Sequence, residues 1–130
     1  MTLKIIIWIT ILMLDVSAYA SDLEKEQRWR EEVEDSIMDG EAVDIRVDGY
    51  DVFAIYTEAE DGSDKGMIVV HGTGIHPNWQ QVVQPIRIEM IAHGWNTLSI
   101  QMPILHNEAA YEEYVPLYPE VPPRLRAAEA

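Results

Sequence analysis

Alternation of apolar and polar residues predicts the first strands of the chain. Val43, Ile45 and Val47 alternate with charged residues, and this two-residue period is typical of a half-buried antiparallel strand. An Asp-Gly pair at residues 48–49 is a hairpin signal, and the apolar residues over 52–57 continue as a second strand. We therefore expect an antiparallel hairpin here, followed by a polar surface loop over residues 58–65.

A continuous apolar run over residues 67–70 is the centre of the predicted fold. Glycines bound it, and His71-Gly72-Thr73-Gly74 follows at once. So short a run fits a strand covered on both faces or a buried helix, and the glycines favour the strand. Gly72 and Gly74 permit a sharp, partly left-handed loop in which backbone N–H groups point at a ligand.

Helical periodicity predicts two longer helices. Residues 21–40 are highly charged, Ser21 or Asp22 can cap the start, and Asp39-Gly40 resembles a stop. An apolar stripe four residues apart is expected to pack on the chain's own domain, although a subunit partner would also fit; it comprises Trp29, Val33 and Ile37. The acidic residues of this segment are interpreted as a solvated face rather than a metal or acid-base site; they are Glu31, Glu32, Glu34 and Asp35.

The second predicted helix precedes another strand. Its apolar residues are expected to face the sheet, and they are Trp79, Val82, Val83, Ile86 and Met90. Pro85 implies either a kink or a regular helix that begins with Pro85 in its first turn. Gly94 predicts a left-handed cap, and a strand over 97–101 completes a parallel strand-helix-strand unit.

Tyrosines and prolines dominate residues 111–123. We expect an extended loop, interpreted as a plain connection in preference to a lid or aromatic rim over a pocket. A short helix over residues 124–130 follows, with Leu125 and Ala128 as its apolar positions.

The N-terminus has the pattern of a secretory signal peptide over residues 1–20. Lys4 supplies the charge, residues 5–14 the apolar core, and Ala18-Tyr19-Ala20 the cleavage signal. A membrane anchor is disfavoured because Asp15 interrupts the run. The remaining domains are a charged amphipathic helix, 21–40, and a small α/β domain, 41–130. A periplasmic or secreted location and no membrane span after cleavage are expected.

Composition excludes several kinds of partner and site. The 130-residue chain has a net charge of -14, which disfavours nucleic acid and anionic membranes. It has no cysteine and therefore no disulfide or thiolate site. A metal site at His71, His76 and His106, with Glu108, matches no compact zinc spacing, and Gly-Thr-Gly lacks the Gly-Lys-Ser/Thr of a phosphate loop. We expect no cofactor.

The loop after the central run resembles a known fold family. His71-Gly72-Thr73-Gly74, residues 75–79 and residues 93–100 are similar to an uncharacterised α/β-hydrolase-like family of Gram-negative envelope proteins. The resemblance covers residues 22–130 and only the front part of that family's domain. It implies an opening hairpin, a parallel β-α-β unit, an oxyanion-like loop at residues 71–74 with the Thr73 amide as donor, and a pocket rim at His76, Met102 and His106.

The same resemblance defines what the sequence lacks. Its fold uses a Gly-x-Ser-x-Gly nucleophile followed by an acid and a histidine, and none of the five serines here lies in that frame. Ser99, inside a strand, is expected to be packed or hydrogen-bonded, and His71 to orient the turn through its ring nitrogens. The neighbouring nucleophile strand would also be missing, so residues 67–70 would form an unguarded edge open to self-association or another polypeptide.

Two functions follow from these observations. The first is an exported α/β-hydrolase-like fragment without catalytic activity of its own, whose intact form would take an ester or amide substrate. The second is a non-catalytic envelope protein that binds a small molecule through the Gly-Thr-Gly amides or a partner through the sheet edge.

Overall fold

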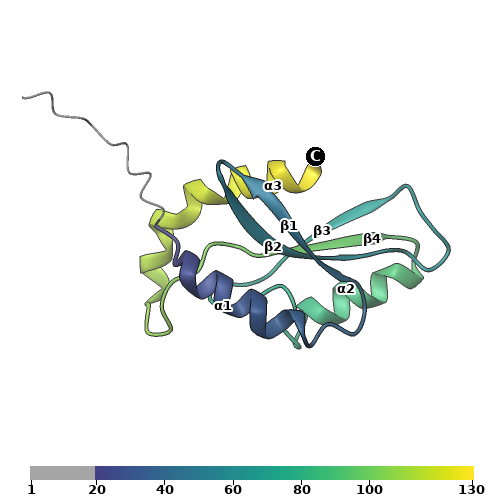
Figure 1. Cartoon of the computed structure of the whole chain (residues 1–130), viewed down its shortest axis with the longest axis horizontal. Coiled ribbons are helices and arrows are strands. Elements are labelled where there is room, and N and C mark those ends of the chain that lie inside the picture. Colours follow the sequence, from purple (N-terminus) through teal and green to yellow (C-terminus); the bar gives the residue numbers. More distant parts are fainter. Residues whose placement is uncertain (1–19) are drawn as a thin grey trace, which may run out of the picture.

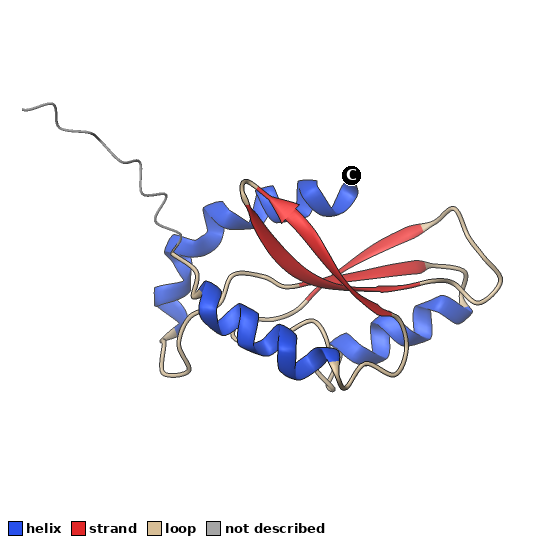
Figure 2. Cartoon of the chain, viewed as in Figure 1, coloured by secondary structure: helices blue, strands red, loops and turns tan. Residues whose placement is uncertain are grey.

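The computed structural model describes residues 20–130, so all but the last residue of the predicted signal peptide lies outside the described residues. The elements follow in the order α1 (Leu23–Glu34), β1 (Glu41–Val47), β2 (Tyr50–Thr57), β3 (Gly66–Val70), α2 (Val83–Ala92), β4 (Asn96–Ile100), η1 (Tyr111–Glu120) and α3 (Val121–Glu129). They form one mixed α/β layer structure, with α1 and α2 on one side of a sheet and α3 on the other (Figures 1 and 2). No helix within residues 20–130 has the length and apolar character needed to cross a membrane.

The four strands form a sheet in the order β1-β2-β4-β3. β1 pairs with β2 and β2 with β4 in antiparallel register, whereas β3 pairs with β4 in parallel register. The predicted hairpin and the parallel β-α-β unit are confirmed. Asp48 and Gly49 both have positive φ, 43° and 96°, which is the conformation of a two-residue type I′ turn.

β3 is one of the two edge strands of this sheet, and β1 is the other. The parallel neighbour of β3 is β4, and among the described strands none pairs with its other side. The expectation of a strand covered on both faces is wrong: Val69 is buried, Met67 and Ile68 are half-buried, and Val70 is 50% exposed. The vacant flank leaves backbone groups of an apolar strand without strand partners, as predicted for residues 67–70.

Each face of the sheet carries its own apolar cluster. On one face, Val52, Ala54 and Ile100 pack with Leu125 and Ala128 of α3. On the other, Phe53 and Ile55 pack with Val33 of α1. The apolar stripe of α1 therefore packs on the chain's own domain as expected, and the acidic residues over 31–35 are exposed.

Among the boundaries of α1 and α2, the end of α1 differs from that expected. The helix predicted over residues 21–40 ends at Glu34, where the Ser36 hydroxyl donates to the Val33 carbonyl at 2.7 Å. Its start is as predicted, because Asp22 accepts a hydrogen bond from the Lys25 amide. α2 begins at Val83, which places Pro85 in the first turn, and it ends before Gly94 with φ at +81°.

The predicted inner face of α2 is partly wrong. Val83 is 3% exposed, but Val82 and Ile86 are 69% and 40% exposed. The fully buried residue is Arg87, which donates to the Asp39 carbonyl at 2.6 Å and to Asn78 Oδ1 at 2.7 Å. The helix begins four residues later than its apolar pattern, so that pattern does not describe one helical face.

The Tyr/Pro segment is a helix rather than an extended loop. η1 is a ten-residue 3₁₀ helix that contains Pro116 and Pro119. Three residues per turn place Tyr114 and Leu117 on one side, and both are buried. Pro116 and Pro119 are also three residues apart and therefore lie together on another side of this helix. α3 then starts at Val121, slightly before its predicted start.

Candidate functional site

The loop after β3 turns sharply at Thr73-Gly74. Gly74 has φ at +75°, whereas Thr73 does not have a positive φ. A positive φ at this position is what the third residue of a type II turn requires, and glycine is favoured there. A Cβ on Gly74 would also stand 3.4 Å from the Tyr114 hydroxyl. Glycine is therefore required here by backbone conformation and favoured by the close approach of η1.

His71 holds this loop against the end of β4. Its Nδ1 lies 2.7 Å from the Gly72 carbonyl oxygen, which can only accept, so Nδ1 carries the proton. Its Nε2 then accepts from the Met102 amide at 2.8 Å and lies 3.0 Å from Gln101 Nε2. Both ring nitrogens are used to orient the turn, as expected. Burial lowers the pKa of His71 to about 4, although the bond to Gly72 opposes this.

A small cavity of about 170 Å³ lies beside the loop. It is at the carboxyl ends of the parallel strands β3 and β4, where open α/β sheets bind ligands. Its walls come from the loop, from the segment after β4, and from η1 and α3: Val70, His71, Gly72, Thr73, Met102, Pro103, Tyr114, Leu117, Tyr118 and Val121. The Tyr/Pro segment, interpreted as a plain connection, thus supplies aromatic residues to this cavity.

The structure brings together only part of the predicted site. His71, Gly72, Thr73 and Met102 line the cavity, and Gly74 lies directly beside them. His76 does not line it and instead packs between Trp29 and Trp79, each ring centroid 5.3 Å away. His106 is on the surface with Nε2 3.9 Å from Glu113. Of the expected rim of His76, Met102 and His106, only Met102 lines the cavity.

The backbone amide of Thr73 is available to a ligand. Within residues 20–130 it takes part in no hydrogen bond, and Gly72 and Thr73 are exposed. Free amides in a glycine loop form a concave site for negative oxygen atoms. The loop can therefore bind a carbonyl or carboxylate oxygen, with the apolar walls of the cavity around the rest of the molecule.

No serine of the described segment stands ready as a nucleophile at this loop. Ser99 is fully buried and donates to the Pro77 carbonyl at 2.8 Å, as expected for a packed hydroxyl. The other hydroxyls are bonded to Glu26, to the Val33 carbonyl and to the Gly94 carbonyl; they belong to Ser21, Ser36 and Ser63. None of the four lines the cavity.

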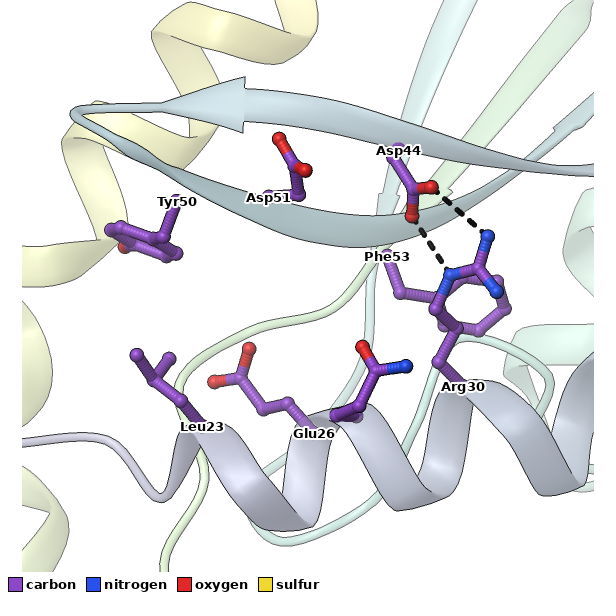
Figure 3. A pocket seen from close by; sticks show the side chains of 8 residues that line it. Leu23, Glu26, Arg30, Asp44, Tyr50, Asp51 and Phe53 are labelled. Atoms are coloured by element: carbon purple, nitrogen blue, oxygen red, sulfur yellow. Dashed lines mark hydrogen bonds and ion pairs between the residues drawn. The ribbon is translucent and has the colours of Figure 1, made fainter.

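A second hollow lies between α1 and the β1-β2 hairpin and has a volume of about 380 Å³ (Figure 3). Three carboxylates line it, those of Glu26, Asp44 and Asp51, and each has an arginine partner. Arg30 binds Asp44 through two hydrogen bonds of 2.8 and 3.0 Å, and Arg46 binds Asp51 at 3.1 Å. Among residues 20–130, no three His, Cys, Asp or Glu side chains are grouped as a metal site. The acidic side chains that line this hollow are therefore engaged in ion pairs with arginines.

A buried ion pair behind that hollow was not predicted. Arg124 of α3 is fully buried and donates to both carboxylate oxygens of Glu26 at 2.8 and 3.1 Å, and to the Gln101 carbonyl at 2.9 Å. Burial raises the pKa of Glu26, and the guanidinium opposes the rise. The two residues are 98 positions apart, so no local pattern connects them. Gln101, which contacts both Arg124 and His71, could have been singled out by its place after β4.

Comparison with known proteins adds a family and nothing more specific. No curated protein and no solved structure matches the chain. A family model described as "Protein of unknown function (DUF3530)" matches residues 15–128, a range that includes every strand and site described above. The chain therefore belongs to the DUF3530 family of proteins of unknown function.

Proposed function

We propose that this chain is an exported, α/β-hydrolase-like protein whose residues 71–74 hold the carbonyl or carboxylate group of a small ester, amide or acid. By itself it binds such a molecule without hydrolysing it. The observation that carries the proposal is the Thr73 amide, which takes part in no hydrogen bond within residues 20–130 and belongs to an exposed residue that lines the cavity. In acyl-transfer sites such an amide stabilises the oxyanion.

Preorganisation of the loop supports this role. His71 is neutral at ordinary pH because its burial disfavours the charged form, and it fixes the turn through Gly72 and Met102. A donor that is already in place loses little entropy when it receives the ligand oxygen. The apolar wall formed by Val70, Met102 and Leu117 suits the hydrocarbon part of a short acyl group.

The chemistry that is missing limits the proposed activity. The hydroxyls of Ser21, Ser36, Ser63 and Ser99 are committed elsewhere, so we expect no acyl-enzyme chemistry from residues 20–130. In the resembled fold the nucleophile strand pairs with the flank of β3 that is vacant here. A hydrolytic form of the site would receive its nucleophile, acid and histidine from a segment paired with that flank.

A matched pair of variants tests the Thr73 amide. Thr73→Pro removes the N–H, and proline suits the second position of a type II turn, whereas Thr73→Ala removes only the side chain. Butyrate binding is followed by amide NMR on the purified chain. Thr73→Pro should weaken binding about 10- to 100-fold, corresponding to about 1.5–3 kcal/mol for a hydrogen bond to a charged group. Thr73→Ala should bind like the unmodified protein.

Two results would contradict the proposal. Absence of butyrate-induced shifts at residues 72–74 would remove the binding role. The second contradicting result is hydrolysis of p-nitrophenyl butyrate that disappears when a single serine is changed to alanine. It would show that this chain contains its own nucleophile. The second candidate, a non-catalytic envelope protein that recruits another polypeptide, is favoured by the vacant apolar edge of β3.

A further inference from the structure

A third hollow, of about 410 Å³, lies between α1 and the loop that leads into α2. It shares no lining residue with the cavity at residues 71–74. Glu32 and Ser36 border it on the α1 side, and the loop contributes Asn78, Trp79, Gln81 and Gln84. Aromatic and amide side chains thus converge on one concave surface, which the proposed function does not use.

Asn78 provides this hollow with a pair of oriented donors. The residue is only 5% exposed, and its Oδ1 accepts from Arg87 Nη2 at 2.7 Å and Arg87 Nε at 3.2 Å. Arginine has donors and no acceptor, so it fixes the carboxamide oxygen toward itself and the NH₂ group on the opposite side. In the described chain Nδ2 has no hydrogen-bond partner, and it is not among the fully enclosed atoms. Asn78 lines the hollow, so these two N–H groups are free for a ligand acceptor there, beside Gln84, whose Nε2 lies 3.4 Å from Asn78 Oδ1.

Trp79 supplies an aromatic surface next to these donors. Its side chain is 38% exposed, and its ring packs against His76 at 5.3 Å in an edge-on arrangement. His76 in turn packs against Trp29 of α1, so a chain of three contacting rings holds Trp79 in position against α1. Burial lowers the pKa of His76, which keeps this support neutral. The ring is held where a ligand can stack on it.

Backbone strain occurs in the same loop. Val82 has φ at 65° and ψ at -58°, which is unfavourable for a β-branched residue. Its side chain is 69% exposed, so the strain is not compensated by burial of valine. Strained residues of this kind persist where the loop conformation serves a site. Here the strained residue separates the loop carrying Trp79 and Gln81 from α2.

The lining chemistry selects among ligand classes. No lysine or arginine lines the hollow, burial lowers the pKa of its histidine, His76, and the whole chain is strongly acidic, so an anion is disfavoured. The Asn78 donors require ligand oxygens, which a simple ammonium group lacks. Glutamine amides both donate and accept, as hydroxyl groups do, and an aromatic ring packs on the C–H face of a pyranose. We propose that this hollow binds a neutral carbohydrate, with one sugar ring on Trp79 and a hydroxyl oxygen at the Asn78 amide.

NMR titration with maltotriose, cellotriose and tri-N-acetylchitotriose tests the proposal, with choline and citrate as charged comparisons. At least one trisaccharide should shift the Trp79 indole and Asn78 carboxamide signals at or below about 10 mM. Asn78→Asp retains an acceptor for Arg87, now as an ion pair, but removes both donors, and it should weaken binding at least about tenfold. Trp79→Ala should do the same. Trp95→Ala, at an indole outside this hollow, should leave binding unchanged.

Three outcomes would overturn the proposal. The first is that no trisaccharide shifts these signals at about 10 mM. The second is that choline or citrate shifts them and the sugars do not. The third is binding that Asn78→Asp leaves unaltered although the variant is folded by amide NMR. Because this hollow and the loop at residues 71–74 share no residue, butyrate binding remains an independent measurement.

Discussion

Protonation of His71 should destabilise the protein as pH falls. The ring donates through Nδ1 to the Gly72 carbonyl, and Nε2 accepts from the Met102 amide. A proton on Nε2 would face that amide N–H and the Gln101 side-chain nitrogen, both at hydrogen-bond distance. In the described chain both of these groups are donors toward Nε2, and His71 is 6% exposed. The neutral ring is thus part of the native structure.

The size of the effect follows from the two pKa values. The pKa of His71 is about 4 when folded, against about 6.5 in an unfolded chain. Between these values the unfolded state binds more protons, so the free energy of unfolding decreases as pH falls. The complete loss is about 3 kcal/mol, and about 2 kcal/mol of it is reached by pH 5. Above about pH 6.5 the contribution is fully present.

Urea unfolding at about pH 7 and about pH 5 measures this contribution when the unmodified chain is compared with His71→Gln. Glutamine does not titrate and can place an oxygen near the Met102 amide. His76 and the carboxylates titrate in both proteins and cancel in the difference. The variant should lose about 2 kcal/mol less than the unmodified chain over this interval. Equal losses in the two proteins would refute the argument.

Two further predictions concern stability and association. Arg124→Met should lower the free energy of unfolding by about 3–5 kcal/mol, because it leaves the Glu26 carboxylate buried without its cation. The double variant Glu26→Gln/Arg124→Met should recover much of that loss in the same urea assay. A double variant that is equally unstable would show that the loss of the ion pair is not the cause. Val70→Lys should reduce concentration-dependent association through the β3 edge, measured by sedimentation. Val82→Lys, at an exposed valine away from this edge, should not reduce it. Equal effects would show that the added charge, and not its place on the β3 edge, causes the change.

The candidate site was predictable where local sequence controls the backbone. Gly72 and Gly74 after an apolar run indicated a tight loop at a strand end, and the loop is there. The side chains around it were less predictable. His76 and His106 are close to the loop in sequence, yet His76 packs with two tryptophans and His106 lies on the surface. Direction of a side chain after a turn depends on packing, which sequence spacing does not specify.

The tail illustrates the same limit. Prolines over residues 111–123 excluded a regular α-helix, and an extended segment was the expectation. The segment instead forms a 3₁₀ helix that contains Pro116 and Pro119, and its three-residue turn places Tyr114 and Leu117 together in the interior. Local propensity allowed both conformations. The packing of Tyr114 and Leu117 beside the cavity at residues 71–74 decides between the extended and the 3₁₀ conformation.

Sequence by itself determined the hairpin, the parallel unit, the N-cap of α1 and the C-terminal end of α2, because strand alternation, an Asp-Gly turn and capping residues act within a few positions. Tertiary structure alone decided which polar residues are buried. Thr97 and Gln101 alternate with apolar residues as a solvated strand face would, but they are fully buried beneath α2 and its preceding loop. Arg87 and Arg124 are likewise buried because their partners come from distant segments. Burial of a charged or polar group depends on whether the complete fold supplies hydrogen-bond partners, and those partners are brought together only by the packed chain.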